Sequence, residues 1–150
     1  MKVSMETPQR DEELSLATRM LGAEAPERVL DGNNVGCVIP SDKMDSIKRM
    51  METITVKEEI VAYIVDIVRG TRETDTVLVG AGPRATQSLI LACRAHAATH
   101  GRDFVTPDDV KSMAEPILQH RIVLRPEYEI EGLTVPEVIT KLMQDVAVPR

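Results

Sequence analysis

Hydrophobic residues recur at helical spacing along most of the chain, and the clearest run lies between residues 57 and 69. Its apolar positions fall on one helix face: Ile60, Val61, Ile64, Val65, Ile67 and Val68. A strand is the competing prediction, because the run is rich in β-branched residues. Strict alternation would place Asp66 in the row of Ile60 and Ile64, so the period favours a helix. Thr55 and Glu58 have the spacing of a capping box, which predicts where this helix begins.

Start and stop signals place further helices on both sides of this run. The expected helices cover Gln9–Leu21, a short stretch such as Pro26–Leu30, Asp42–Glu52, Pro83–His100, Thr106 toward His120, and Thr134 to Met143. Gly22 and Gly101 are expected to close two of them, and Pro116 should bend or shorten the helix that contains it. We expect mainly loop at Ala23–Pro40, and a linker or short extended segment at Thr74–Gly82.

The fold class that follows is all-α, a small helical bundle of about six helices with no convincing sheet. Composition agrees, because aromatic residues make up only 2% of the 150 residues and the core must therefore be aliphatic. Met, Leu and Ala, which would help to fill such a core, favour helices. The length suits one domain with a short appendage. We expect residues 1–8 to form a short extended segment and linker, and residues 9–150 to form the helical domain.

Charge and cysteine content exclude several classes of protein. The formal net charge of −6 repels polyanions, and few aromatic side chains are present to stack on bases, so no nucleic-acid partner is expected. Two cysteines, Cys37 and Cys93, are too few for a disulfide framework. No apolar run reaches the length of a membrane span, and no leader peptide opens the chain. These features predict a cytoplasmic protein.

The sequence lacks the motifs of a stand-alone enzyme. No Gly-Lys pair is present, so there is no G-x-x-x-x-G-K-[ST] phosphate-binding loop. Gly80-Ala81-Gly82 does not extend to G-x-G-x-x-G, because Ala85 stands at the third glycine. His96 and His100 are spaced for a zinc site, but Ala97 replaces the glutamate of the zincin pattern. We therefore interpret the histidines as structural or exposed and expect no metal site.

Arg84 is the candidate functional residue that spacing alone indicates. It follows Pro83 in the first turn of an expected helix, where a cation opposes the helix dipole at a cost of a few tenths of a kcal/mol. A bound anion would reverse that penalty. The free N–H groups of a helix start and a guanidinium suit a phosphate, and the flanking glycines allow close backbone approach. An exposed arginine with no ligand is the alternative.

Several motifs in combination resemble the MoxR-type AAA+ ATPases. Residues 80–85, Gly-Ala-Gly-Pro-Arg-Ala, resemble the family's sensor-2 motif G-A-S-P-R-A. Residues 101–110 resemble its G-R-[DE]-[FY]-V-T-P-[DE]-D-[VI], and residues 120–122 resemble its H-R-[ILV]. Residues 131–132 and 148–150 resemble the family's C-terminus, while residues 2–13 resemble the end of the core's last strand entering the lid. Gly82 departs from the usual Ser, which would loosen the helix cap.

The resemblance implies that the chain is the helical lid of such an ATPase, with residues 1–8 left over from the ATPase core. Walker A, Walker B, sensor 1 and the arginine finger belong to that core, so we expect no ATPase activity from this chain alone. In the family, ATP and Mg²⁺ lie between core and lid, and the residue matching Arg84 contacts the γ-phosphate, with Gly82 and Pro83 lining the nucleotide. The implied partners are the core, neighbouring subunits of a ring expected to be a hexamer, and von Willebrand A-domain proteins. The ring would be a chaperone-like machine for protein complexes.

A binding module without any ATPase role is the competing hypothesis. Residues 105–110, Val-Thr-Pro-Asp-Asp-Val, followed by a helix, also resemble the end of a histone fold or part of a helix-turn-helix module. The acidic balance argues against DNA as the partner of such a module, but a protein partner remains compatible with it. Salt-sensitive DNA binding would favour this alternative.

Overall fold

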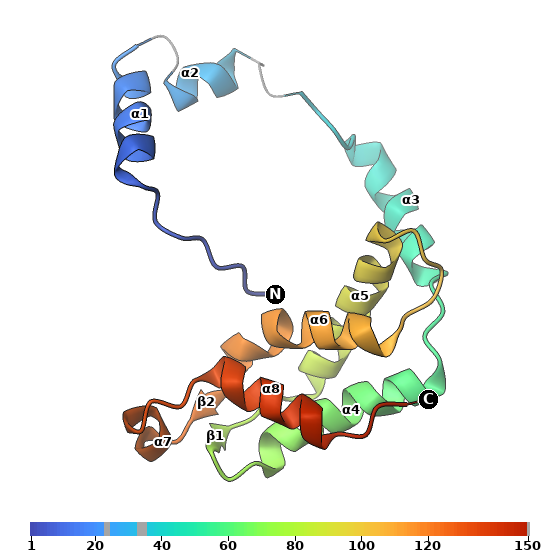
Figure 1. Ribbon diagram of the computed structural model, residues 1–150. Helices are drawn as coiled ribbons and strands as arrows, with labels where there is room; N and C mark the ends of the chain where they lie inside the picture. The colour runs from blue at the N-terminus through green and yellow to red at the C-terminus, as the bar shows by residue number, and fades with distance from the viewer. Residues whose placement is uncertain (23–24, 33–35, 150) are drawn as a thin grey trace. The chain divides into compact units, whose positions relative to one another are not determined.

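The computed structural model describes residues 1–22, 25–32 and 36–149 (Figure 1). The described chain is mostly helical, as predicted, and it divides into two compact units. One unit is Ser4–Ser46, and the other joins Met1–Val3 to Ile47–Arg150. The loop expected at Ala23–Pro40 lies partly outside the described residues.

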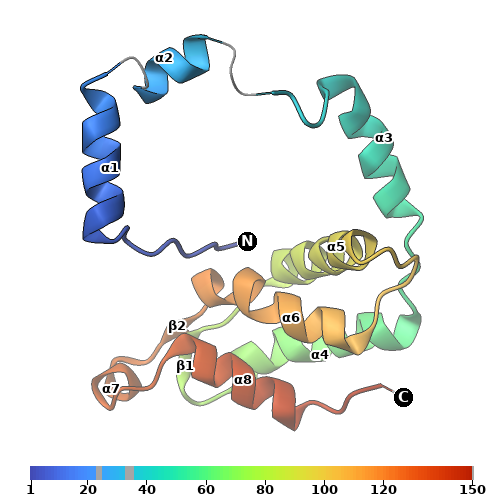
Figure 2. The same cartoon turned by 45° about the horizontal axis from the view of Figure 1, so that its top comes forward.

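The larger unit is a helical bundle around an aliphatic core. Its four long helices are α4 (Glu58–Glu73), α5 (Pro83–Thr99), α6 (Pro107–Leu118) and α8 (Val135–Asp145). Helix α6 lies between α5 and α8, and α4 packs against α5 and α8 (Figure 2). The largest fully buried apolar side chains come from all four helices and include Ile64, Ile67, Leu89, Leu118 and Ile139. The apolar face predicted for α4 is therefore the face that packs into the core.

A small sheet is the main departure from the all-helical prediction. Strands β1 (Val77–Val79) and β2 (Val123–Leu124) pair antiparallel, with Val77 opposite Leu124. The 3₁₀ turn η1 (Gln119–Arg121) precedes β2, and the short helix α7 (Pro126–Ile130) follows it. Val77 and Leu124 are buried, so the pair adds apolar surface to the core. The prediction of no convincing sheet is thus corrected by two short strands, one of them within the short extended segment expected at Thr74–Gly82, and the fold is mostly helical as predicted.

Backbone pairing also changes the predicted start of α4. Thr55 does not cap the helix: its N–H donates to the Asp103 carbonyl at 2.8 Å, and its carbonyl accepts from the Val105 N–H at 3.0 Å. Helix α4 begins at Glu58 instead. The prediction of a capping box at Thr55 was wrong, because pairing with a distant segment holds this backbone extended. The pairing places the segments that lead into α4 and α6 side by side.

The unit of Ser4–Ser46 differs from the larger unit because its helices bury no residues. It contains α1 (Arg10–Met20), α2 (Pro26–Asp31) and the first half of α3 (Ser41–Glu52). None of these three helices has a buried residue. Exposed apolar side chains are frequent in this unit and include Leu14, Leu21, Leu30, Val38 and Met44. The helices expected here are present, but they do not enclose a core.

The first residues of the chain are extended and exposed. Met1–Val3 belongs to the larger unit, and the Lys2 N–H donates to the Pro116 carbonyl at 2.7 Å. Helix α6 continues two residues beyond Pro116 before it gives way to η1, so the proline lies close to the end of the helix. Among the described residues, no helix is long and apolar enough to cross a membrane.

Candidate functional site

The predicted site residues lie together where β1 leads into α5. Gly82 is the N-cap of α5, Pro83 is its first residue and Arg84 its second, as predicted. All three are exposed. Within the described parts of the chain, the Arg84 guanidinium has no hydrogen-bond or ion-pair partner, and only the Arg84 carbonyl is engaged, by the Ser88 hydroxyl at 2.9 Å. The arginine is thus free to reach a ligand outside the chain.

A buried hydrogen bond holds the linker that carries Arg84. The Thr71 hydroxyl near the end of α4 accepts from the Ala81 N–H at 2.9 Å and donates to the Val68 carbonyl at 2.6 Å. Thr71 and Ala81 are each 1% exposed. Because a buried N–H that loses its partner costs about 1–3 kcal/mol, this contact fixes the linker on α4. The start of α5 is therefore set by tertiary contact as well as by its local sequence.

Gly80 allows the linker to approach α4 this closely. A Cβ atom at residue 80 would lie 2.6 Å from the Thr71 carbonyl oxygen and 2.6 Å from the Arg72 side chain. Backbone atoms cannot move aside easily, so only glycine fits without a shift. At Gly82, in contrast, an added Cβ would meet nothing within 4 Å, and φ is −87°. The two glycines predicted to allow close approach thus differ, and only Gly80 needs to be glycine for steric reasons.

Arg121 is a second cation near α5 that the sequence reasoning did not single out. It lies in η1, and its guanidinium donates to the Ser88 hydroxyl at 3.1 Å. Ser88 is one turn after Arg84 on α5, so Arg121 contacts the helix face that also carries Arg84. The signal was present in the motif His120-Arg121-Ile122, but no chemical reason in the sequence connected it with residue 88.

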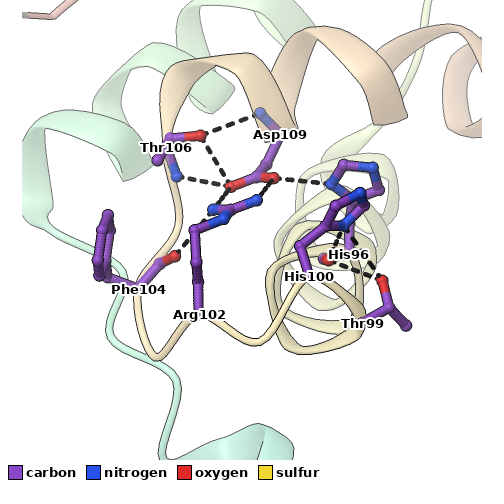
Figure 3. A network of polar contacts seen from close by, with 7 residues as sticks. All are labelled: His96, Thr99, His100, Arg102, Phe104, Thr106 and Asp109. Atoms are coloured by element: carbon purple, nitrogen blue, oxygen red, sulfur yellow. Dashed lines mark hydrogen bonds and ion pairs between the residues drawn. The ribbon is translucent and has the colours of Figure 1, made fainter.

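The densest polar network lies at the other end of α5, around Asp109 (Figure 3). The Asp109 carboxylate is 1% exposed and receives two hydrogen bonds from Arg102, at 2.6 and 2.7 Å. It also accepts from the Thr106 N–H at 2.8 Å and the Thr106 hydroxyl at 2.9 Å, which closes a capping box at the start of α6. His96 Nδ1 lies 2.7 Å from Oδ1, the oxygen that also accepts the shorter of the two Arg102 hydrogen bonds. One carboxylate thus joins α5, α6 and the loop between them.

The electrostatics of Asp109 follow from these contacts. Burial alone would raise the pKa of the carboxyl, but hydrogen bonds from Arg102, Thr106 and His96 outweigh it and hold the pKa well below its ordinary value. The same contact with Asp109 raises the pKa of Arg102. Asp109 is therefore ionised and fully hydrogen-bonded at neutral pH, which is the pattern of a structural ion pair.

The remaining candidates for chemistry are held in structural roles or isolated. His96 contacts Asp109, and His100 Nδ1 lies 2.8 Å from the His96 carbonyl (Figure 3). No group of metal-binding side chains occurs among the residues described. Cys93 is buried, and burial followed by the charge of Asp109 raises its pKa to about 12, so this thiol is not a nucleophile at neutral pH.

Comparison with known proteins identifies the class of the helical unit. Residues 69–142 match the family model of the AAA lid domain. The chain also aligns over its whole length with the crystal structure of a candidate ATPase from Cytophaga hutchinsonii, with a TM-score of 0.81 and 26% identity, and covers 46% of that structure. Residues 69–142 are therefore a AAA lid domain.

Relatives by sequence narrow the assignment. The chain is 27% identical to Chaperone MoxR1 of Mycobacterium tuberculosis over 158 aligned residues, which cover 99% of this chain and 40% of MoxR1. It is 26% identical to Protein MoxR of Methylorubrum extorquens over 146 aligned residues, 88% of this chain and 40% of that protein. The uncharacterized protein YeaC of Bacillus subtilis is 35% identical over 112 residues, 75% of this chain and 35% of YeaC. The chain is thus homologous to the lid of MoxR-type AAA+ ATPases, and it spans less than half the length of these relatives.

Proposed function

We propose that this chain is the nucleotide-sensing lid of a MoxR-type AAA+ ATPase and supplies Arg84 to the phosphates of an ATP–Mg²⁺ complex held by a AAA+ core. The observation that carries the proposal is the position of Arg84. It is an exposed cation in the first turn of α5, without a partner among the described residues, on a linker fixed by Thr71. A guanidinium in that position binds an anion by a charge-assisted hydrogen bond. Gly82 and Pro83 would line the nucleotide beside it.

The exposed apolar surface beside this site is consistent with a core that packs there. Leu78 and Val79 of β1 and Val123 of β2 are each about half exposed on the sheet that precedes Arg84. Exposed apolar side chains in a cluster commonly mark a contact surface. We propose that the AAA+ core covers this sheet and that residues 1–8 are the end of that core, followed by the lid at 9–150.

The proposal also covers how the whole ATPase assembles and which partners it has. From the family resemblance we propose a cytoplasmic, ring-shaped ATPase, with a hexamer as the expected ring and a chaperone-like role, and one relative, MoxR1, is named a chaperone. ATP hydrolysis would change the angle between core and lid and so act on protein complexes. Von Willebrand A-domain proteins are the proposed partners. The alternative of a histone-fold-like module draws support only from residues 105–110, which here form the loop and first turn of α6 in the lid.

The test uses a polypeptide in which this chain is joined to its AAA+ core. The Arg84→Ala variant should leave the fold intact and lower the rate of ATP hydrolysis about 100-fold, because a charge-assisted contact to the transferred phosphoryl group is lost. Arg125→Ala, which removes an exposed arginine at the N-cap of α7, is the matched control and should retain activity. Turnover of Arg84→Ala equal to that of the control would refute the proposal.

A further inference from the structure

A groove with an apolar floor and an acidic rim lies at the C-terminal end of α4, next to the loop that leads into β1. It has a volume of about 460 Å³ and is formed by the end of α4, the loop before β1, α7 and α8. Tyr128, Leu133, Val138 and Leu142 supply the apolar surface. Four acidic residues and one basic residue surround it: Glu73, Asp75, Glu137, Asp145 and Lys141. The charged groups of the rim therefore sum to −3.

Two of the four carboxylates are already engaged within the chain. Glu137 accepts from the Thr134 N–H at 2.8 Å and from the Thr134 hydroxyl at 2.6 Å, and these hydrogen bonds lower its pKa. Glu73 forms an exposed ion pair with Arg69 at 3.3 Å. Asp75 and Asp145 are exposed, and neither has a hydrogen-bond or ion-pair partner among the described residues. These two aspartates are the groups available to a ligand.

The wall of the groove contains one further group without a partner. The Thr76 hydroxyl is buried and makes no hydrogen bond within the described residues, while the Thr76 carbonyl accepts from the Arg125 N–H at 3.0 Å. Because this hydroxyl has almost no solvent-accessible surface, a ligand in the groove would not reach it, and it is not part of the site. The groove thus offers a ligand an apolar floor and two carboxylates at the rim, Asp75 and Asp145, that no described residue engages.

We propose that this groove binds a basic segment of a partner protein, in which an arginine or lysine lies beside an apolar residue. Such a side chain matches both surfaces, because its methylene stem packs on apolar residues while its charged end stays at the rim. Asp75 and Asp145 would accept charge-assisted hydrogen bonds from the guanidinium or ammonium group. Acidic segments and nucleic acids are repelled by the same rim. Arg84 is not among the residues that line the groove.

The experiment measures binding to the full chain by fluorescence polarisation. The probe is a fluorescein-labelled peptide of three Leu-Arg-Gly repeats, and the comparison peptide has every arginine replaced by glutamine. The double variant Asp75→Asn, Asp145→Asn should weaken binding of the arginine peptide about tenfold, which corresponds to about 1.4 kcal/mol. Lys141→Gln, which removes the only basic group of the rim, should strengthen binding about twofold or more.

A matched control separates this groove from general attraction to an acidic protein. The double variant Asp66→Asn, Glu115→Gln makes the same change in net charge at exposed positions of α4 and α6 that do not line the groove. It should weaken binding less than twofold, and circular dichroism should show all variants equally folded. The proposal is overturned if both double variants weaken binding equally, if the glutamine peptide binds as tightly, or if the arginine peptide does not bind.

Discussion

Asp109 joins three segments of the chain through one buried carboxylate. Replacing it by asparagine removes the charge that faces Arg102 and one acceptor of the capping box at α6. Because Asp109 is buried and accepts charge-assisted hydrogen bonds, whereas Arg102 is 28% exposed and can be hydrated, Asp109→Asn should lower the free energy of unfolding by about 2 kcal/mol at pH 7. Chemical denaturation measures this change. Asp108→Asn is the matched control, since Asp108 is 90% exposed and its pair with Lys111 is 3.7 Å long, and it should change stability by less than about 0.5 kcal/mol.

The pH dependence of folding stability gives a second measurement of the role of Asp109. The folded state lowers the pKa of Asp109 below that of the unfolded chain, which is about 3.9. The stability that it contributes is therefore fully present above pH about 4 and is lost as the pH falls toward the folded-state pKa. The difference in stability between wild type and Asp109→Asn should accordingly narrow below pH 4. A difference that stays constant down to pH 2 would contradict the assigned ionisation.

At the scale of elements, the joint between α4 and α5 determines where Arg84 lies. Gly80→Ala would bring a Cβ against the Thr71 backbone at 2.6 Å, so the linker must shift. We expect a loss of stability of about 1–3 kcal/mol, typical of overpacking, measured by thermal unfolding. Gly82→Ala is the matched control two residues away, where the added Cβ meets open space, and it should cost less than 1 kcal/mol. Equal effects of the two variants would show that the close approach at Gly80 does not matter.

The elements also show which parts of the fold local patterns can predict. The helices α4, α5 and α6 were predicted because amphipathic period, Pro at the first turn and the Thr106-Pro107-Asp108-Asp109 helix start are local signals. The sheet was missed because β1 and β2 have three and two residues and lie far apart in the chain, so neither shows a period of its own. Thr55 had the local signal of a cap, yet pairing with the segment around Phe104 prevailed.

For the whole molecule, the two units should differ strongly in local stability. Helix α1 has no buried residue, whereas α5 contains four. Amide exchange requires the helix to open, and opening costs more free energy where it exposes buried apolar surface. Amides of α1 should therefore exchange orders of magnitude faster than those of α5 in the isolated chain. Hydrogen exchange measured by mass spectrometry tests this directly. Slow exchange throughout α1 would mean that this unit has a core within the chain itself.

The sequence and the tertiary structure determined different features of the candidate site. By itself, the sequence determined that Arg84 stands in the first turn of a helix, because Pro83 and the preceding glycines specify that start locally. The family resemblance gave the arginine its proposed role. Only the tertiary structure decided that Thr71 and Gly80 hold its linker, that Arg121 approaches the same helix, and that Asp109 is buried between Arg102 and His96. These contacts join residues from 7 to 33 positions apart, and their energies depend on burial and approach distance, which no local pattern of residues encodes.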